Sequence, residues 1–281
     1  MNVAAALIAA SERLQESGVV DPGREAQSLL AFALKRPSAF LIAHPEHELT
    51  ADENATFDES VGRRSSREPF QYIVGHQEFY GLDFEVSPDV LIPRPETEIL
   101  VEDAIKILQD SKNPRFCEIG VGSGCVSVSI LHNVVNSTAI GIDISDKALT
   151  VARRNAAKHH VLERVQFRQG DVFGGLNGKF DLIVSNPPYI PIGEVAGLQP
   201  EVASFEPHEA LAGGADGLEI VRRIAADSQE HIAPLGVLLI EIGFGQADAV
   251  GGLFDPSYWE APDFLPDLQG VPRVLKVRAR A

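Results

Sequence analysis

The strongest constraint on this chain is a regular alternation of short apolar strands and amphipathic helices after Arg94. Such alternation is typical of a mostly parallel sheet that is covered by helices on both faces. Ligands of these sheets bind beyond the carboxyl ends of the strands, so the residues that directly follow each strand are candidates for a site. Strands are predicted over 115–119, 138–142, 165–168, 180–185, 236–242 and 273–277, and helices over 95–108, 125–132, 146–158, 217–231 and 246–253.

A glycine-rich loop follows the first of these strands. Gly120, Gly122 and Gly124 alternate there with Val121 and Ser123. Glycines allow the backbone to approach a ligand without interference from a Cβ atom. The spacing differs from the G-x-G-x-x-G of dinucleotide-binding folds, and the loop lacks the Gly-Lys-Ser/Thr of a P-loop. Taken alone, the loop is also compatible with a tight turn that binds nothing.

Acidic residues follow the next two strands. Asp143 ends the second strand, roughly 20 residues after the loop, where a carboxylate can accept hydrogen bonds from both ribose hydroxyls of a nucleoside. Asp171 lies just past the third strand, where it or the adjacent Val172 can border an adenine. An isolated carboxylate is usually a solvated surface group, but the series of strand-end features favours a nucleoside cofactor without a pyrophosphate. S-adenosylmethionine fits this pattern better than NAD.

The fourth strand leads into Asn186, Pro187, Pro188 and Tyr189. Two consecutive prolines fix two φ angles and remove two N–H donors, so the loop presents carbonyl groups with few competing donors. The side-chain amide of Asn186 adds another acceptor oxygen. A rigid turn without a function is the alternative, but the position beside the predicted nucleoside site favours a role in binding.

This loop suits the methylation of a planar –NH₂ group, whose delocalised lone pair is a poor nucleophile. The Asn186 side chain and the Pro187 carbonyl can accept both N–H groups of such a substrate. They would orient the lone pair at the methyl group and stabilise the positive charge that develops on nitrogen. Most of the rate would then come from positioning and electrostatics, with Tyr189 as a wall against the planar group.

The residues before Arg94 differ in pattern. Apolar residues at helical spacing, a proline at the start of a second helix and a Thr50–Glu53 capping box predict a small all-helical domain over residues 1–70. Aromatic and β-branched residues interleaved with glycine then predict a hairpin connector over 71–93. The alternating region, 94–281, is the predicted catalytic domain.

The composition limits the partners. A net charge of −16 without a long Lys/Arg run disfavours direct binding of nucleic acid and favours a protein partner or a small molecule. No segment approaches the roughly 18 apolar residues of a membrane span, and the first residues do not resemble a signal peptide. Cys117 and Cys125 are interpreted as reduced thiols, and no Cys/His spacing is typical of a zinc site. We therefore expect a cytoplasmic monomer without a metal.

Several segments together resemble the release-factor glutamine methyltransferases, the HemK/PrmC family. The similarity is good from about residue 66 to 240 and looser over the helical amino-terminal part. No single motif is as specific as the combination. The segments that carry it are Glu68–Gly75, Leu91–Glu98, Gly120–Gly124, Asp143, Asn186–Tyr189 and Phe205–Pro207.

The resemblance implies a Rossmann-like class I methyltransferase domain with a mostly parallel seven-stranded sheet. It implies transfer of a methyl group from S-adenosyl-L-methionine, leaving S-adenosyl-L-homocysteine, to N5 of the glutamine in the Gly-Gly-Gln motif of class-1 peptide-chain release factors. It also implies that the helical domain helps to dock the release factor. The predicted cofactor-binding residues are Glu118, Gly120, Val121, Gly122, Ser123, Gly124, Asp143, Asp171, Val172 and Asn186, and the predicted substrate-binding residues are Asn186, Pro187, Pro188 and Tyr189, of which Asn186, Pro187 and Tyr189 are the predicted catalytic residues.

The chain departs from the family pattern at a few positions. Glu118 stands where the family often has Asp, and this longer carboxylate either reaches the methionine ammonium of the cofactor or is structural. Val121 replaces a frequent Thr, which removes one possible hydroxyl contact. Pro272 stands near the last strand where an acidic residue is common, a change that we expect to leave the site untouched.

Two other functions stay open on the residues alone. The Asn-Pro-Pro-Tyr loop suits adenine N6 or guanine N2 equally well, with Tyr189 stacked on the base, as in a nucleic-acid amino-methyltransferase. The other is a non-catalytic binding module with a vestigial nucleotide fold. The acidic charge and the two signature segments, Glu68–Gly75 and Leu91–Glu98, weigh against the first, and the intact motifs weigh against the second.

Overall fold

A computed structural model describes all 281 residues of the chain, which divide into two compact units. Unit 1 contains Met1–His76 together with Gln199–Phe205, and unit 2 contains Gln77–Leu198 and Glu206–Ala281. The chain thus leaves unit 2 after Leu198 for seven residues and then returns to it. No helix in either unit is both long and apolar enough to cross a membrane.

Unit 1 is all-helical, as predicted. Its core consists of apolar residues at helical spacing, among them Leu14, Leu29, Leu30 and Phe57. Pro22 opens the second helix, and Thr50 and Glu53 form the expected capping box at the start of the fourth. The helices are α1 (Val3–Glu16), α2 (Pro22–Leu34), α3 (Ser38–Ala43), α4 (Ala51–Ser65), α5 (Phe70–Val74) and α9 (Pro200–Phe205).

The prediction that the hairpin begins at Gln71 is wrong. Residues Phe70–Val74 form the short helix α5, which begins after Pro69 and ends at Gly75 in the left-handed conformation, with φ of 81°. The apolar run Tyr72-Ile73-Val74 is too short for its periodicity to distinguish a strand from a helical turn. The hairpin itself exists further on, as β1 (His76–Phe79) and β2 (Leu82–Glu85), which form a two-stranded sheet.

A buried ion cluster ties α9 into unit 1. The Arg64 side chain is only 5% exposed and bonds both Glu25 and Glu201, with 2.9 Å from its Nη2 to Glu201 Oε1. Arg67 bonds the other oxygen of Glu201 at 2.7 Å. Burial by itself would raise the pKa of Glu201, but hydrogen bonds from Arg67 and Arg64 outweigh it and lower that pKa to about 2. The segment after Leu198 is therefore held in unit 1 by charge as well as by packing.

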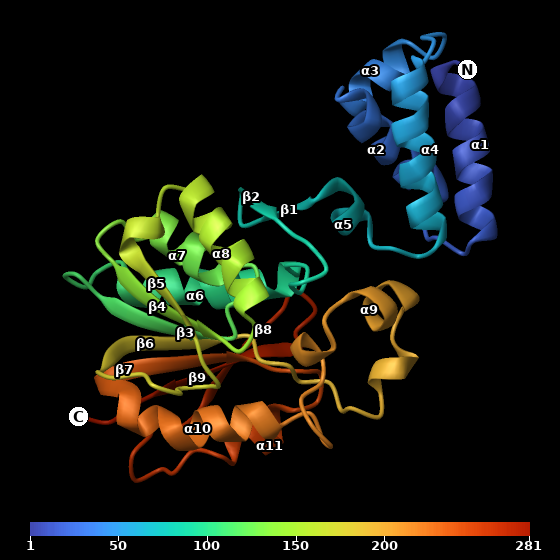
Figure 1. Ribbon diagram of the computed structural model, residues 1–281. Helices are drawn as coiled ribbons and strands as arrows, with labels where there is room; N and C mark the ends of the chain where they lie inside the picture. Colours follow the sequence, from blue (N-terminus) through green and yellow to red (C-terminus); the bar gives the residue numbers. More distant parts are fainter. The chain divides into compact units, whose positions relative to one another are not determined.

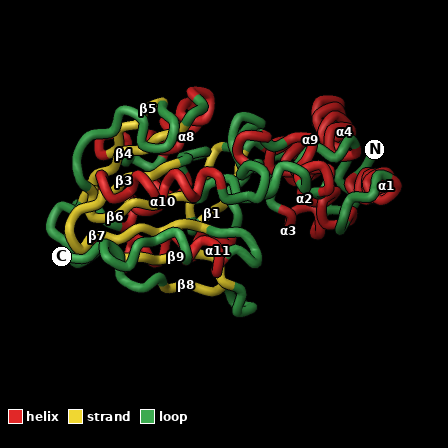
Figure 2. Tube along the Cα trace, turned by 90° about the horizontal axis from the view of Figure 1, so that it is seen from below, coloured by secondary structure: helices red, strands yellow, loops and turns green.

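Unit 2 is built on the predicted mostly parallel seven-stranded sheet, in the order β5-β4-β3-β6-β7-β9-β8 (Figures 1 and 2). The five strands from β5 to β7 are parallel, and β9 and β8 are antiparallel additions at one edge. The strands are β3 (Arg115–Ile119), β4 (Thr138–Asp143), β5 (Val165–Gln169), β6 (Phe180–Ser185), β7 (Ile232–Glu241), β8 (Asp263–Pro266) and β9 (Pro272–Arg278).

Helices cover both faces of this sheet (Figure 1). On one side lie α6 (Glu98–Leu108), α7 (Cys125–Asn133) and α8 (Asp146–Lys158), and on the other α10 (Glu219–His231) and α11 (Ala247–Gly251). Short 3₁₀ turns occur at Pro95–Thr97, Leu162–Arg164, Val195–Gly197 and His208–Ala210.

Alternate residues of the central strands enter different cores. On β6, Leu182 and Val184 pack with α6 and α7, while Ile183 packs with α10. The same alternation on β7 sends Val237 and Leu239 to the α6 face. Because side chains alternate with a period of two, the face of any residue at a strand end follows from this register.

The strands and helices predicted over 94–281 are present, with three differences. β7 begins at Ile232 rather than at 236, and β8 was not predicted. Helix α9 was not predicted either, and it belongs to unit 1 although it lies within the range predicted for the catalytic domain. Strand β8 contains Asp263 and Pro266 and only two apolar residues, so its sequence lacks the apolar run of a buried strand.

A substitution of Gly141 in β4 tests how tightly the α7–α8 side of the sheet is packed. A Cβ atom there would lie 2.7 Å from Val121 Cγ2 and 2.9 Å from Phe167 Cδ1. We expect Gly141→Ala to destabilise unit 2 by about 1–3 kcal/mol, because overpacking forces its neighbours to move. Urea denaturation measures this.

Gly193→Ala is the control, since a Cβ at that position meets no atom within 4 Å. In the double variant Gly141→Ala/Val121→Ala the clashing side chain is smaller. The double variant should therefore lose less unfolding free energy than the two single variants lose together. A Gly141→Ala protein as stable as wild type would refute the close packing.

Candidate active site

The candidate site lies where the direction of the strand order reverses. Strands β3, β4 and β5 run outward to one side, and β6 and β7 to the other, so the switch point lies between β3 and β6. Ile119 pairs with Ser185 at the carboxyl ends of these two strands. A Cβ atom on Gly120 would be 3.8 Å from the Asn186 carbonyl oxygen. The glycine loop and the Asn-Pro-Pro-Tyr loop are thus neighbours at the place where such sheets bind ligands.

The glycine loop needs its glycines. Gly120, Gly122 and Gly124 have φ of 76°, 55° and 81°, a region that residues with a Cβ atom rarely adopt. The Gly120 amide donates to the Ile142 carbonyl at 2.8 Å, which anchors the loop on β4. A Cβ on Gly122 would meet nothing within 4 Å, so this face of the loop is open to a ligand.

Asp143 is held beside the loop. Its Oδ2 accepts from the Gly122 amide at 2.8 Å and its Oδ1 accepts from the Ser145 amide at 2.9 Å. Burial raises the pKa of this carboxyl, and these backbone donors oppose the rise. Each oxygen has further lone pairs, so the carboxylate can accept additional hydrogen bonds from a ligand.

Val121 and Ser123 are predicted cofactor residues whose side chains are buried. Val121 is 3% exposed and packs with Leu149 and Ala152. Ser123 is 2% exposed, and its carbonyl accepts from the Asn155 side chain at 2.9 Å. Their side chains therefore shape the loop from behind, and a contribution of Val121 to a ligand would come from its backbone.

Glu118 is buried on the α7 side of β3. Its carboxylate accepts from the Ser127 amide at 3.1 Å and from the Ser127 hydroxyl. Burial raises the pKa of Glu118 to about 8, although the Ser127 hydrogen bonds oppose this. Glu118 therefore joins β3 to the first turn of α7, which is the structural role that the sequence left open.

Asp171 and Val172 follow β5. The Asp171 carboxylate is exposed and bonds Arg223 on α10 at 2.8 Å. Val172 is 6% exposed, and its φ of 52° is unusual for a β-branched residue. The backbone is therefore strained just after β5, and the Asp171 side chain forms an ion pair with Arg223 on the surface. A role for either residue in cofactor binding stays a prediction.

Asn186 presents its oxygen, because its nitrogen is already bound. The Asn186 Nδ2 donates to the Thr97 hydroxyl at 3.1 Å. No group of the chain donates to Asn186 Oδ1 or to the carbonyl of the neighbouring, buried Pro187. These two acceptors come from consecutive residues at the switch point.

The next two carbonyls of the loop are closed off. The Tyr189 carbonyl accepts from Gln246 Nε2 at 3.0 Å, and a Cβ on Gly217 would lie 2.2 Å from it. A Cβ on Gly213 would lie 2.5 Å from the Pro188 carbonyl oxygen. Asn186 and Pro187 are therefore the two positions at which the loop has acceptors to offer.

The Tyr189 ring is turned toward the end of β7. A Cβ on Gly243 would lie 3.1 Å from its Cδ2 atom. Burial and the nearby Glu241 carboxylate raise the pKa of Tyr189 to about 12, so the phenol is neutral. The ring can still border a substrate, and its role as a wall stays a prediction.

Three residues that the sequence does not single out support the loop, namely Thr97, Glu241 and Gln246. Thr97 lies in the Leu91–Glu98 segment, whose sequence indicates only a resemblance to the family. Glu241 ends a strand, as Asp143 does, and that position was a usable signal. Gln246 had none, because its contact with Tyr189 depends on the tertiary fold.

A buried acid holds the same signature segment. Arg94 bonds Glu206 at 2.5 Å, and the Ile92 amide donates to the other oxygen of that carboxylate at 3.3 Å. The Glu206 side chain is 1% exposed. The Leu91–Glu98 and Phe205–Pro207 segments, which are far apart in the sequence, therefore belong to one structure.

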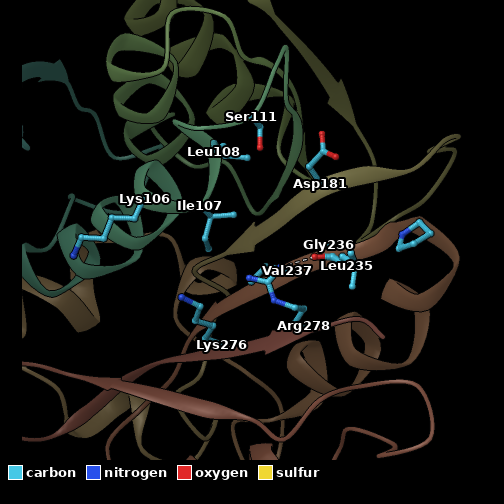
Figure 3. Close-up of a pocket in the computed structure, with 11 residues that line it drawn as sticks. Lys106, Ile107, Leu108, Ser111, Asp181, Leu235, Gly236, Val237, Lys276 and Arg278 are labelled. Carbon is cyan, nitrogen blue, oxygen red and sulfur yellow. Dashed lines mark hydrogen bonds between the residues drawn. The ribbon is translucent and has the colours of Figure 1, made fainter. Parts of the chain in front are cut away.

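A cavity of about 440 Å³ lies elsewhere, near the amino ends of β6 and β7 (Figure 3). Asp181, Gly236 and Arg278 are among its lining residues. Its cations are engaged: Lys106 bonds Glu102, Lys276 bonds Asp103, and Arg278 donates to the Leu235 carbonyl. This cavity lies at the amino ends of the parallel strands, whereas the polar residues of the candidate site follow their carboxyl ends. We therefore do not assign the site to it.

The chain is similar to known methyltransferases. Residues 5–75 match the family model of the PrmC N-terminal domain, and residues 96–197 match that of the methyltransferase small domain. The chain is 41% identical to the release factor glutamine methyltransferase of Koribacter versatilis (strain Ellin345), over 98% of each chain. It is 40% identical to that of Cereibacter sphaeroides (strain ATCC 17023), over 100% of each chain.

Solved structures confirm the architecture. The ribosomal protein L11 methylase from Lactobacillus delbrueckii subsp. bulgaricus is similar with a TM-score of 0.52 at 16% identity, over 73% of this chain and 90% of that one. A methyltransferase from Pyrococcus furiosus gives a TM-score of 0.52 at 17% identity, over 72% and 91%. At these identities the likeness shows the fold alone.

The raised pKa of Glu118 predicts a pH-dependent stability. The folded protein holds this proton up to about pH 8, whereas an unfolded glutamate releases it near its ordinary value of 4.5. The stabilisation from this group is thus complete below pH 4.5 and is lost as the pH rises to about 8. We expect Glu118→Gln to reduce the fall in unfolding free energy between pH 5 and 8.

Urea denaturation of unit 2 at several pH values measures this slope. Glu102→Gln, an exposed change on α6, is the control and should leave the slope unchanged. If wild type and Glu118→Gln lost stability equally over this range, Glu118 would not be the titrating group.

Proposed function

The chain belongs to the release factor glutamine methyltransferase family, and from this premise we propose that it methylates N5 of the glutamine in the Gly-Gly-Gln motif of class-1 peptide-chain release factors. The family predicted from the motifs is thereby confirmed. The pair of unoccupied acceptors at Asn186 and Pro187 carries the proposal for the reaction.

S-adenosylmethionine supplies an activated methyl group on a positively charged sulfur. The glycine loop and Asp143 fit the nucleoside part of this cofactor. The open face at Gly122 leaves room for a ligand against the backbone, and Asp143 keeps lone pairs free for ribose hydroxyls. Glu118, Asp171 and Val172 stay predicted members of the cofactor site.

The loop binds the substrate amide through the two N–H groups of that amide. Asn186 Oδ1 and the Pro187 carbonyl each accept one N–H, which fixes the plane of the amide and leaves the lone pair to face the methyl group. As the S–CH3 bond breaks and neutral S-adenosylhomocysteine leaves, both acceptors stabilise the positive charge that forms on nitrogen. The methylated nitrogen then loses one of its two protons, which is acidic at this stage and passes to solvent. Their rigidity comes from the two prolines and from Thr97, so little reorganisation is needed.

The same pair of acceptors rejects glutamate. A carboxylate would present lone pairs to Asn186 Oδ1 and to the Pro187 carbonyl, and both acceptors would stay unpaired. Leaving buried acceptors unpaired costs about 1–3 kcal/mol, and charge repulsion adds to this. Specificity for an amide therefore follows from the chemistry of the loop.

We further propose that unit 1 docks the release factor. The match of residues 5–75 to the PrmC N-terminal domain model supports a function distinct from that of the catalytic unit. We propose that the enzyme acts as a monomer in the cytoplasm.

The test is direct. The protein is incubated with labelled S-adenosylmethionine and, separately, with a class-1 release factor, DNA and ribosomal RNA, and the added methyl is mapped by mass spectrometry. We expect label on the Gly-Gly-Gln glutamine alone. Label on adenine N6 or guanine N2 instead would establish the nucleic-acid amino-methyltransferase and overturn the proposal.

Asn186→Ala should lower turnover roughly 100-fold while largely preserving cofactor affinity, because it removes one of the two acceptors. Steady-state rates with a release factor and calorimetry with S-adenosylmethionine separate the two effects. Asn136→Ala, an exposed change in the same unit, is the matched control. Wild-type turnover in Asn186→Ala would remove this residue from the reaction.

Asp143→Ala should chiefly weaken cofactor binding, by about 10- to 100-fold, since a hydrogen bond to a charged group contributes roughly 1.5–3 kcal/mol. Asp146→Ala, three residues further and exposed, is the control. Calorimetry on both variants measures the dissociation constant. An unaltered constant in Asp143→Ala would place the ribose elsewhere.

A further inference from the structure

Glu241 is a buried acid beside the reacting loop that the proposed reaction has not yet used. Ser185 pairs with Ile240 in the parallel β6–β7 ladder, so Asn186 and Glu241 are the next residues on neighbouring strands. Both continue the alternation that sends Val184 and Leu239 to the α6 face. Glu241 is 2% exposed, and its Oε2 atom has no hydrogen-bond partner.

Thr97 lies between Glu241 and Asn186. It directly precedes α6 and is 2% exposed. Its hydroxyl oxygen accepts from Asn186 Nδ2 at 3.1 Å. The same hydroxyl lowers the pKa of Glu241, so it lies close to that buried carboxyl. Asn186, Thr97 and Glu241 are therefore neighbours inside the sheet–helix interface.

Tyr189 provides a second connection. Its hydroxyl also lowers the pKa of the Glu241 carboxyl, and its ring packs on Gly243 just beyond β7. One buried carboxyl therefore lies near both ends of the Asn-Pro-Pro-Tyr loop. A carboxylate only accepts hydrogen bonds, so a hydroxyl bonded to it must point its hydrogen toward it.

We propose that Glu241 is a positioning residue for methyl transfer: it accepts a hydrogen bond from the Thr97 hydroxyl, and Thr97 in turn holds the Asn186 amide with its oxygen toward the substrate. This inference rests on the proposed function and assigns it a residue beyond the two motif loops. Glu241 itself does not touch the substrate in this arrangement.

The direction of the hydrogen bonds explains why an acid is needed. When Glu241 accepts from the Thr97 hydroxyl, that oxygen can only accept from Asn186, so the Asn186 NH₂ faces Thr97. If the residue at 241 donates to Thr97 instead, the hydroxyl hydrogen is free to bond Asn186 Oδ1. The amide then turns over and presents its NH₂ group to the substrate N–H groups, which it cannot accept.

The ionisation of Glu241 makes this arrangement sensitive to pH. Burial raises its pKa to about 7, while the Thr97 and Tyr189 hydroxyls and Arg273 oppose the rise and Glu96 adds to it. Arg94 also lies near this group of residues, since its positive charge lowers the pKa of Tyr189. Below this pKa the protonated acid can donate to Thr97, so turnover should rise as the pH increases through about 7.

Three variants of the 281-residue chain test this role with a release factor as substrate. Glu241→Gln keeps the shape but can donate. Thr97→Val keeps the shape but breaks the chain of hydrogen bonds, and Thr97→Ser restores the hydroxyl. Glu230→Gln, an exposed change on α10, is the control. Turnover and KM are measured from pH 6 to 9, with cofactor affinity and thermal unfolding measured alongside.

We expect Glu241→Gln and Thr97→Val each to lower kcat roughly 10- to 100-fold, with KM and cofactor affinity little changed, since misorientation of a reacting group has effects of this size. The rise of kcat through pH 7 should disappear in Glu241→Gln, and Thr97→Ser should recover most of the activity. The double variant Glu241→Gln/Thr97→Val should be no slower than the worse single variant, because both changes break one chain of hydrogen bonds.

Several results would overturn the inference. It fails if Glu241→Gln keeps wild-type kcat and its pH dependence, or if Thr97→Val is as active as Thr97→Ser. Should Glu241→Gln not fold, the Thr97 pair still decides the matter. If the wild-type protein places no methyl on the glutamine, the proposed function fails first and this inference with it, whereas an active wild type with unaffected variants refutes the positioning role alone.

Discussion

The parallel pairing of β3 with β6 is the constraint on which the site depends. It brings the ends of two strands that are far apart in the sequence to adjacent positions, with Ile119 beside Ser185. The glycine loop and the Asn-Pro-Pro-Tyr loop leave the sheet from these points, so a methyl donor held by the first meets an amide held by the second. No residue in either loop could perform its proposed role if the ladder slipped by one position, because a slip by one residue reverses the faces of the strand.

The polar groups behind the site are unusually well buried. Glu118 on β3 and Glu241 on β7 both point to the side covered by α6 and α7, and burial raises the pKa of each. Glu118 holds the start of α7, and Glu241 lies against Thr97 at the start of α6. A buried carboxyl is costly unless it is hydrogen-bonded. The donor to Glu118 is Ser127 in the first turn of α7, and the hydroxyl beside Glu241 is that of Thr97, which directly precedes α6. These acids thus connect the sheet to the helices whose positions set the two loops.

The sequence supported a correct prediction wherever local chemistry decides the structure. Short apolar runs predicted the central strands, and three glycines in left-handed conformations occupy the predicted loop. It failed at Tyr72-Ile73-Val74, where three apolar residues fit either a strand or a helical turn. It also missed β8, whose few apolar side chains are only partly buried at the edge of the sheet. The side chains of Val121 and Ser123 pack into the core, which a motif cannot reveal because it records residue types and not directions.

By itself the sequence determined the class of fold, the family and the two loops that face the reactants, because those properties depend on hydrophobic periodicity, on glycine and proline, and on the order of residues within one segment. The tertiary structure alone decided which oxygen atoms stay free. Thr97, Gln246, Gly213 and Gly217 come from distant segments, and they engage or enclose Asn186 Nδ2 and the Pro188 and Tyr189 carbonyls, but not Asn186 Oδ1 or the Pro187 carbonyl. The placement of Glu241 beside Asn186 is likewise a result of strand pairing. Hydrogen bonds between residues far apart in the chain depend on the packed arrangement, and no local pattern in the sequence encodes them.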